Sequence, residues 1–168
     1  MSKPKQPRPA YFVNLSPRAQ ALLTAEAATG DDILKVAFKD FADLARQGKL
    51  LEYEDWPHHS TISATSGSVF GKVGPFYKPK DARDEPILHM HVMPLGYILG
   101  KHEHHSTSDL CIVYADFDLF DERIIIILAA GSSHKGNMPE SLVEKFMEEY
   151  QEIRKKLIPF IKGKLGLP

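Results

Sequence analysis

Cysteine is nearly absent from this sequence, since Cys111 is the single example among 168 residues. One thiol excludes an internal disulfide, and its place in an apolar run, Leu110 to Val113, predicts a buried and inert side chain. We therefore expect a cytoplasmic protein that works in a reducing compartment.

Long apolar runs are missing as well, because no stretch approaches the roughly 18 apolar residues of a membrane span. The basic, proline-containing N-terminus has no apolar segment behind it, so no secretory signal is expected. The net charge of −1 lacks the excess of Lys and Arg that coats nucleic acid. We expect no membrane contact and no DNA contact of the chain's own.

What remains is an ordinary globular composition, with 43% hydrophobic and 26% charged residues. The length suits one domain with a real core, so residues 1–168 are expected to form a single domain. Prolines and basic residues near the start predict a flexible tail over residues 1–15.

Three helices are predicted from caps and apolar periodicity. Ser16-Pro17 begins the first helix, which ends before Gly30, and the second runs from Asp31 or Asp32 to Gly48. The third begins at Pro139 and carries an apolar stripe; Pro159 should end or kink it. The stripe consists of Leu142, Phe146, Tyr150, Ile153 and Leu157.

Strands are predicted between the second and third helices. Residues 87–93 alternate, with Leu88, Met90 and Val92 on one face and two histidines on the other. Residues 110–114 and 123–130 predict an antiparallel pair joined by an acidic stretch, and residues 50–77 one or two short strands. The fold class is α+β, an antiparallel sheet flanked by two N-terminal helices and one C-terminal helix.

Histidines are concentrated in one part of the chain. Six of the eight lie between positions 89 and 134: His89, His91, His102, His104, His105 and His134. Any one of them can simply be a solvated side chain, which is the simplest interpretation of His58, His59 and His104. The clustering argues against that interpretation for the others.

Two chemical interpretations of this cluster stay open. A His-x-His pair on a strand, with His102, Glu103 and His104 nearby, can chelate a metal ion, although the spacing matches no tight metal signature. Alternatively, two imidazoles and a cation can cleave RNA through its own 2′-hydroxyl without a metal. His134 with Lys135 offers one proton carrier and the cation, and His91 or His105 offers the other carrier.

A series of motifs in this half of the chain resembles the YafO-type toxins of bacterial type II toxin–antitoxin operons. The convincing part runs from His89 to about Arg154, and residues 87–157 are the expected toxin-like core. The motifs are Ile87-Leu-His-Met-His-Val92, Ser106-Thr-Ser-Asp109, Ile112-Val-Tyr114, Phe120-Asp-Glu-Arg123, the isoleucine run to Leu128, and His134-Lys135.

The resemblance implies a RelE-like fold and a ribosome-dependent endoribonuclease that cleaves mRNA and stops translation. It implies no cofactor and no metal, mRNA on the ribosome as the substrate, and a cognate antitoxin as the inhibiting partner. Two alternatives stay open: a histidine-rich metal-binding enzyme or sensor, and a non-catalytic toxin relic that only binds its partner.

Carried onto this sequence, the resemblance gives a set of site residues. The expected catalytic residues are His91, His105, Thr107, Asp109 and His134, and the expected RNA or phosphate contacts are His89, Lys135 and Arg154. Tyr114 also matches, but core packing against the last helix is the preferred interpretation. The chain departs from the family at Ser106, where a basic residue is usual, so phosphate binding moves to His105 or activity is weak or lost.

Overall fold

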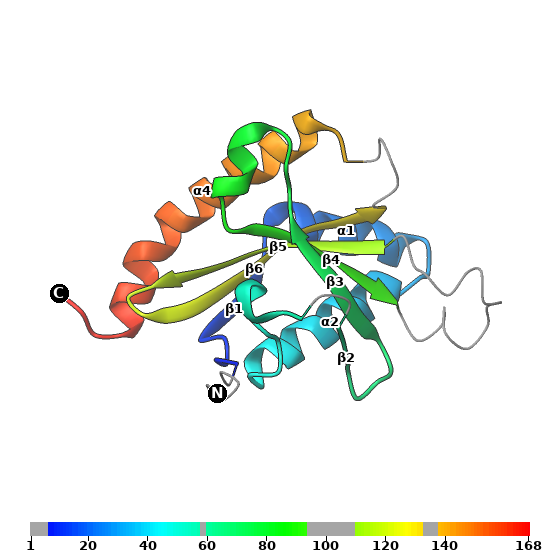
Figure 1. The fold of residues 1–168 in the computed structure, drawn as a ribbon, viewed down its shortest axis with the longest axis horizontal. Helices are drawn as coiled ribbons and strands as arrows, with labels where there is room; N and C mark the ends of the chain where they lie inside the picture. Colours follow the sequence, from blue (N-terminus) through cyan, green and yellow to red (C-terminus); the bar gives the residue numbers. More distant parts are fainter. Residues whose placement is uncertain (1–6, 58–59, 94–109, 133–137) are drawn as a thin grey trace.

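The computed structural model describes residues 7–57, 60–93, 110–132 and 138–168. These form a six-stranded sheet in the order β1-β6-β5-β4-β3-β2, with helices around it (Figure 1). The strands are β1 (Phe12–Leu15), β2 (Thr61–Ser63), β3 (Val69–Pro75), β4 (Ile87–Met93), β5 (Leu110–Leu119) and β6 (Glu122–Ser132). The expected α+β class is confirmed.

The helices also match the predicted order. They are α1 (Pro17–Ala28), α2 (Ile33–Arg46) and α4 (Glu140–Lys164), with short 3₁₀ turns η1 (Tyr53–Asp55) and η2 (Lys80–Asp84). Ser16 caps α1 by accepting a hydrogen bond from the backbone N–H of Ala19, and Pro17 occupies the first helical position. Among the described residues, no helix is long and apolar enough to cross a membrane.

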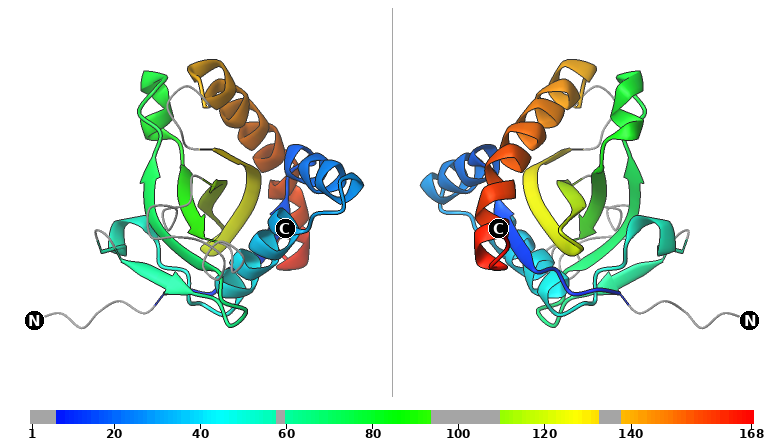
Figure 2. Two further views of the ribbon diagram at one scale, coloured as in Figure 1. Left: turned by 90° about the vertical axis from the view of Figure 1, so that its right-hand side faces the viewer. Right: turned by 90° about the vertical axis from the view of Figure 1, so that its left-hand side faces the viewer.

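The isoleucine run explains why the sheet has a core on both faces. Ile125 and Ile127 of β6 pack into the apolar cluster under α2, while Ile124 and Ile126 pack into the cluster under α4. The two helices therefore cover opposite faces, as expected for a central strand with period-two alternation. Figure 2 shows α1 beside α4, and Arg18 of α1 pairs with Glu149 of α4 at 3.0 Å.

The structure differs from the prediction of a flexible tail over residues 1–15. Phe12–Leu15 forms β1, which pairs in parallel with β6 and makes the sheet mixed, whereas all its other neighbouring strands are antiparallel. Arg8 forms ion pairs with Glu52 and Asp118. These long-range contacts hold residues 8–15 in place, and residues 1–6 lie outside the described part.

The acidic connection between β5 and β6 is shorter than the sequence suggested. Asp116 and Asp118 belong to β5, and the turn itself is Phe120-Asp121, with φ of 54° and 67°. Two consecutive left-handed residues make the tight hairpin turn that suits the twist of paired strands. The antiparallel pairing of these strands is confirmed.

The last helix does not end at its proline. α4 continues through Pro159 to Lys164, and Ile161 beyond the proline is fully buried. Phe160 also packs against Phe12 of β1, with ring centroids 5.7 Å apart. These contacts compensate for the single helical hydrogen bond that proline cannot donate.

Candidate functional site

The paired histidines lie where the alternation of β4 predicts. Leu88, Met90 and Val92 are buried in the cluster under α2, and His89 and His91 project from the other face. Their ring centroids are 6.4 Å apart. Two imidazoles this close, on a strand that is paired on both sides, are held in a fixed relation to one another.

His89 is in an environment that favours its neutral form. Its ring lies 4.8 Å from that of Phe76, and within the described part of the chain its buried Nδ1 has no hydrogen-bond partner. Burial, and secondarily the nearby His91, lowers the pKa of His89 from its ordinary value of 6.5. At neutral pH the ring is therefore uncharged and ready to accept a proton.

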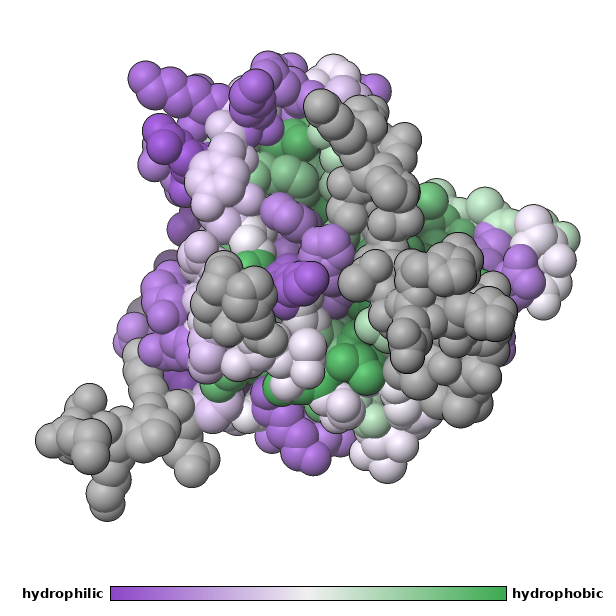
Figure 3. All heavy atoms as spheres, turned by 45° about the vertical axis from the view of Figure 1, so that its right-hand side comes forward, coloured by the Kyte–Doolittle hydropathy of each residue, from purple (hydrophilic) through white to green (hydrophobic). Residues whose placement is uncertain are grey.

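Two neighbouring cavities open beside these histidines, and Lys72 lines both. The larger, about 560 Å³, includes His89 in its wall, and the smaller, about 90 Å³, includes His91. Figure 3, a view of one side of the molecule, shows apolar side chains in hollows of the surface with polar ones beside them.

Lys72 reaches this position through a bulge in β3. Gly71 pairs with His91 and Val73 with Met90, so Lys72 is an extra residue between two paired ones. Its φ of 54° is left-handed, which is unusual for a residue other than glycine. The bulge thus sets one cation between the two histidine cavities.

Five predicted site residues, His105, Thr107, Asp109, His134 and Lys135, lie outside the described residues. These five residues belong to the segments 94–109 and 133–137, and the described residues that flank both segments can be located. Leu110 pairs with Ser132 at the same end of the sheet where His91 pairs with Cys111. Both segments are therefore joined to the sheet at the end where His91 lies.

Arg154 is the one described site residue that the structure keeps apart from the histidines. It lies on the exposed side of α4, where it hydrogen-bonds Tyr150, and it lines neither histidine cavity. Tyr150 packs against Phe117 of β5. A direct role for Arg154 beside His89 or His91 therefore has no support from this geometry.

Cys111 and Tyr114 are core residues, as the sequence indicated. Cys111 is fully buried, and burial raises the pKa of Tyr114 well above its ordinary value. Tyr114 packs against Phe41 of α2, with centroids 4.8 Å apart. The expectation that Tyr114 packs against the last helix was wrong, because β5 directs this side chain to the opposite face.

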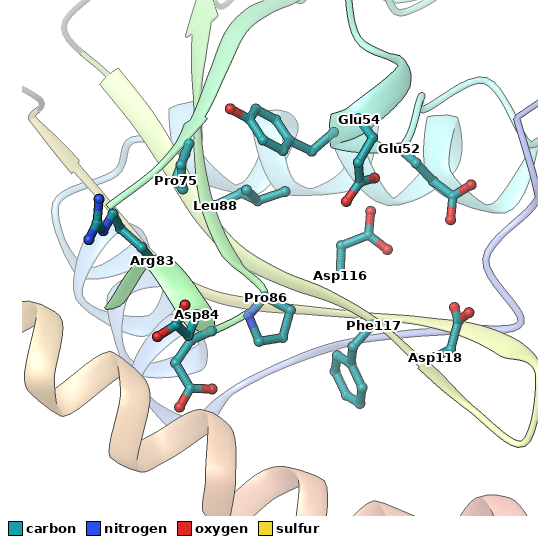
Figure 4. A pocket seen from close by; sticks show the side chains of 12 residues that line it. Glu52, Glu54, Pro75, Arg83, Asp84, Pro86, Leu88, Asp116, Phe117 and Asp118 are labelled. Atoms are coloured by element: carbon teal, nitrogen blue, oxygen red, sulfur yellow. The ribbon is translucent and has the colours of Figure 1, made fainter. Parts of the chain in front are cut away.

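A third cavity, of about 510 Å³, has the wrong charge for RNA. Figure 4 shows Glu52, Glu54, Asp116 and Asp118 around it, with Arg83 at the far side. Arg8 forms ion pairs with both Glu52 and Asp118, and the buried Arg123 pairs with Asp116, so these carboxylates serve the fold. A phosphate backbone would be repelled by the remaining acidic groups.

The metal interpretation can be compared with the described side chains only. In residues 7–57, 60–93, 110–132 and 138–168, no three His, Cys, Asp or Glu side chains are grouped to hold a metal ion. His102, Glu103 and His104, which the metal interpretation also uses, lie outside those ranges.

Sequence reasoning missed the aromatic part of the site. Tyr53, Trp56 and Tyr77 line the same cavity as His89. The position of Lys72 between the two histidine cavities was missed as well. Three aromatic residues before and after β3 were the available signal, but their convergence depends on how residues 53–57 pack beside that strand.

A comparison with known families agrees with the motifs. The family model described as "Toxin YafO, type II toxin-antitoxin system" matches residues 54–156, more than half of the chain. That range contains the β3 bulge, both strand histidines and most of α4. No curated protein matches the chain, and no solved structure does. The chain belongs to the YafO family of type II toxin–antitoxin toxins.

Proposed function

We propose that this toxin is a ribosome-dependent endoribonuclease that cleaves mRNA without a metal. The observation that carries the proposal is the pair of imidazoles on β4, 6.4 Å apart, with Lys72 lining the cavities of both. Two proton carriers and one cation are what cleavage through the RNA 2′-hydroxyl requires. The two strand histidines and Lys72 supply this set in one place.

The proposed reaction begins with the 2′-hydroxyl, whose oxygen attacks the neighbouring phosphorus while His89 takes its proton. The bond from phosphorus to the 5′-oxygen breaks, and His91 or His134 donates a proton to that oxygen. The products are a 2′,3′-cyclic phosphate and a 5′-hydroxyl. His89 was expected to contact phosphate, but its lowered pKa suits a neutral proton acceptor better.

Cations and polar side chains complete the site in this proposal. Lys72 and Lys135, with Thr107, bind the non-bridging phosphate oxygens as negative charge develops on them. Asp109 orients a neighbouring side chain, and His105 binds phosphate in place of the basic residue that the family usually has at position 106. Arg154 contacts RNA backbone farther from the cleaved bond, because α4 exposes it away from the histidines.

A cognate antitoxin is the proposed partner, since the family belongs to type II toxin–antitoxin systems. Binding of the antitoxin holds the toxin inactive until the antitoxin is lost. The proposal requires that co-production of the antitoxin, encoded beside the toxin, abolishes every effect of the toxin on growth.

Induced expression in a bacterial host tests this function. The wild type should arrest growth and translation and create new mRNA ends, and His91→Ala should abolish all three effects. Lys72→Asn removes the charge but suits the left-handed backbone, so it should reduce cleavage while the chain stays folded. Lys164→Ala, at an exposed lysine at the end of α4, is the matched control and should behave as wild type.

Two results would contradict the proposal. The first is normal growth and intact transcripts when the wild type is produced in soluble form. The second is growth arrest by His91→Ala that equals the arrest by wild type, because the histidine pair would then be irrelevant to toxicity.

A further inference from the structure

The larger histidine cavity has an aromatic wall that the cleavage chemistry does not use. Tyr53, Trp56 and Tyr77 all line it, beside Lys72 and His89. Tyr77 is 66% exposed and Tyr53 38% exposed, so both rings are accessible to a ligand. An aromatic wall next to a cation is the combination that binds single-stranded nucleic acid.

The cavity lies where the pairing between β2 and β3 stops. β2 pairs with β3 only as far as Gly71, and the rest of β3, Val73–Pro75, borders the cavity. Residues 53–57 lie along that edge, and the indole N–H of Trp56 donates to the carbonyl oxygen of Ser60 at 3.1 Å. This hydrogen bond fixes the orientation of the Trp56 ring, so this part of the wall is formed before any ligand arrives.

Size and charge both suit a nucleotide. The volume of about 560 Å³ falls in the range of cavities that bind small organic molecules. Glu54 also lines the cavity, but Figure 4 shows its carboxylate turned toward Asp116, into the neighbouring acidic cavity. The aromatic side is therefore left with Lys72 as the charged group beside His89.

We propose that this cavity is a base-stacking subsite that binds one nucleobase of the RNA next to the cleaved phosphate. The inference rests on the proposed nuclease function and adds to it how the strand is positioned. The base stacks on Tyr77 and Tyr53 against Trp56, and Lys72 binds the adjoining phosphate. Stacking uses the ring face, so all four bases bind and purines, with the larger face, bind more tightly.

Trp56 makes the test direct, because it is the single tryptophan of the chain. The full-length protein is titrated with a tetraribonucleotide whose 2′-O-methyl groups prevent cleavage. The fluorescence of Trp56 should change as the oligonucleotide is added and then reach a plateau. Four further oligonucleotides each lack the base at a different one of the four positions. One of these four should bind about tenfold more weakly than the intact oligonucleotide.

Variants separate stacking from general effects on the surface. Tyr77→Phe keeps the ring and should bind within about twofold of wild type, whereas Tyr77→Leu should lose about tenfold. Tyr11→Leu is the matched control, since Tyr11 is 39% exposed but lies outside the cavity. It should bind as wild type does.

Equal affinity for the intact and all abasic oligonucleotides would overturn the inference, as would normal binding by Tyr77→Leu. It would also fail if Tyr77→Leu weakened only neutralisation by the antitoxin, which would assign the aromatic surface to a protein partner. Because the probe is not cleaved, the two proposals fail separately: binding without nuclease activity refutes the nuclease alone, and nuclease activity without base dependence refutes the subsite alone.

Discussion

Replacement of His89 by glutamine is expected to lower the rate of RNA cleavage by about 100-fold or more. Glutamine has a similar length and still forms hydrogen bonds, but it cannot accept the proton of the 2′-hydroxyl. The rate is measured in a single turnover, with the protein in excess over ribosome-bound mRNA. Binding of an uncleavable RNA should change by less than about threefold, because the variant removes chemistry and leaves the aromatic wall intact.

The pH dependence of the wild-type rate gives a second view of the same side chain. Burial and His91 lower the pKa of His89, so the ring remains neutral to a pH below 6.5. The loss of rate on the acid side should therefore lie below pH 6.5. A His89→Gln protein that cleaves within about threefold of wild type would remove His89 from the reaction.

The substitution Arg123→Leu is expected to reduce the free energy of unfolding by about 3–5 kcal/mol. The Arg123 side chain is fully buried and pairs with Asp116 at 2.7 Å. It also donates to the carbonyl oxygens of Arg8 and Leu50, at 2.8 and 2.7 Å. Its loss leaves a buried carboxylate without a counterion and two carbonyl groups without their donor. Urea unfolding followed by circular dichroism measures the change.

A double variant serves as the control for this ion pair. Arg123→Leu combined with Asp116→Leu removes both charges, so it should recover part of the stability lost in the single variant. The recovery will be incomplete, because the carbonyl groups of Arg8 and Leu50 still lack a donor. A loss below about 1 kcal/mol in Arg123→Leu would show that the pair is not the link between β5, β6 and the N-terminal segment.

Local patterns predicted those elements whose contacts repeat along the chain. The alternation of residues 87–93 placed His89 and His91 on one face, and the four isoleucines predicted a strand buried on both faces. Ser16-Pro17 predicted the start of α1. In each case burial or capping acts on neighbouring residues, so the sequence carries the information locally.

Strand β1 was missed because its stability comes from a distant partner. Phe12–Leu15 is only four residues long, follows a proline-rich segment and pairs with residues 124–127. A short edge strand has only a weak intrinsic preference for the β conformation. Parallel pairing with a strand more than a hundred residues away in the sequence leaves no local pattern. The same holds for the ion pairs of Arg8 with Glu52 and Asp118.

The candidate site was predictable in its histidines and unpredictable in its surroundings. A bulge places Lys72 between two cavities. Nothing in the sequence Gly71-Lys72-Val73 predicts a left-handed backbone conformation at the lysine. The aromatic wall requires residues 53–57 and Tyr77 to meet across the open edge of β3. Both features arise from tertiary packing, which periodicity and propensity do not describe.

The ends of the cleaved RNA provide the most direct test of a metal-free mechanism that uses the 2′-hydroxyl. The purified toxin is incubated with ribosomes and a defined mRNA, and the products are mapped and their termini identified. The mechanism predicts 2′,3′-cyclic phosphate and 5′-hydroxyl ends, and no cleavage where the nucleotide before the cut carries a 2′-deoxyribose. Ends with 3′-hydroxyl and 5′-phosphate, or cleavage that persists at the deoxyribose, would contradict it.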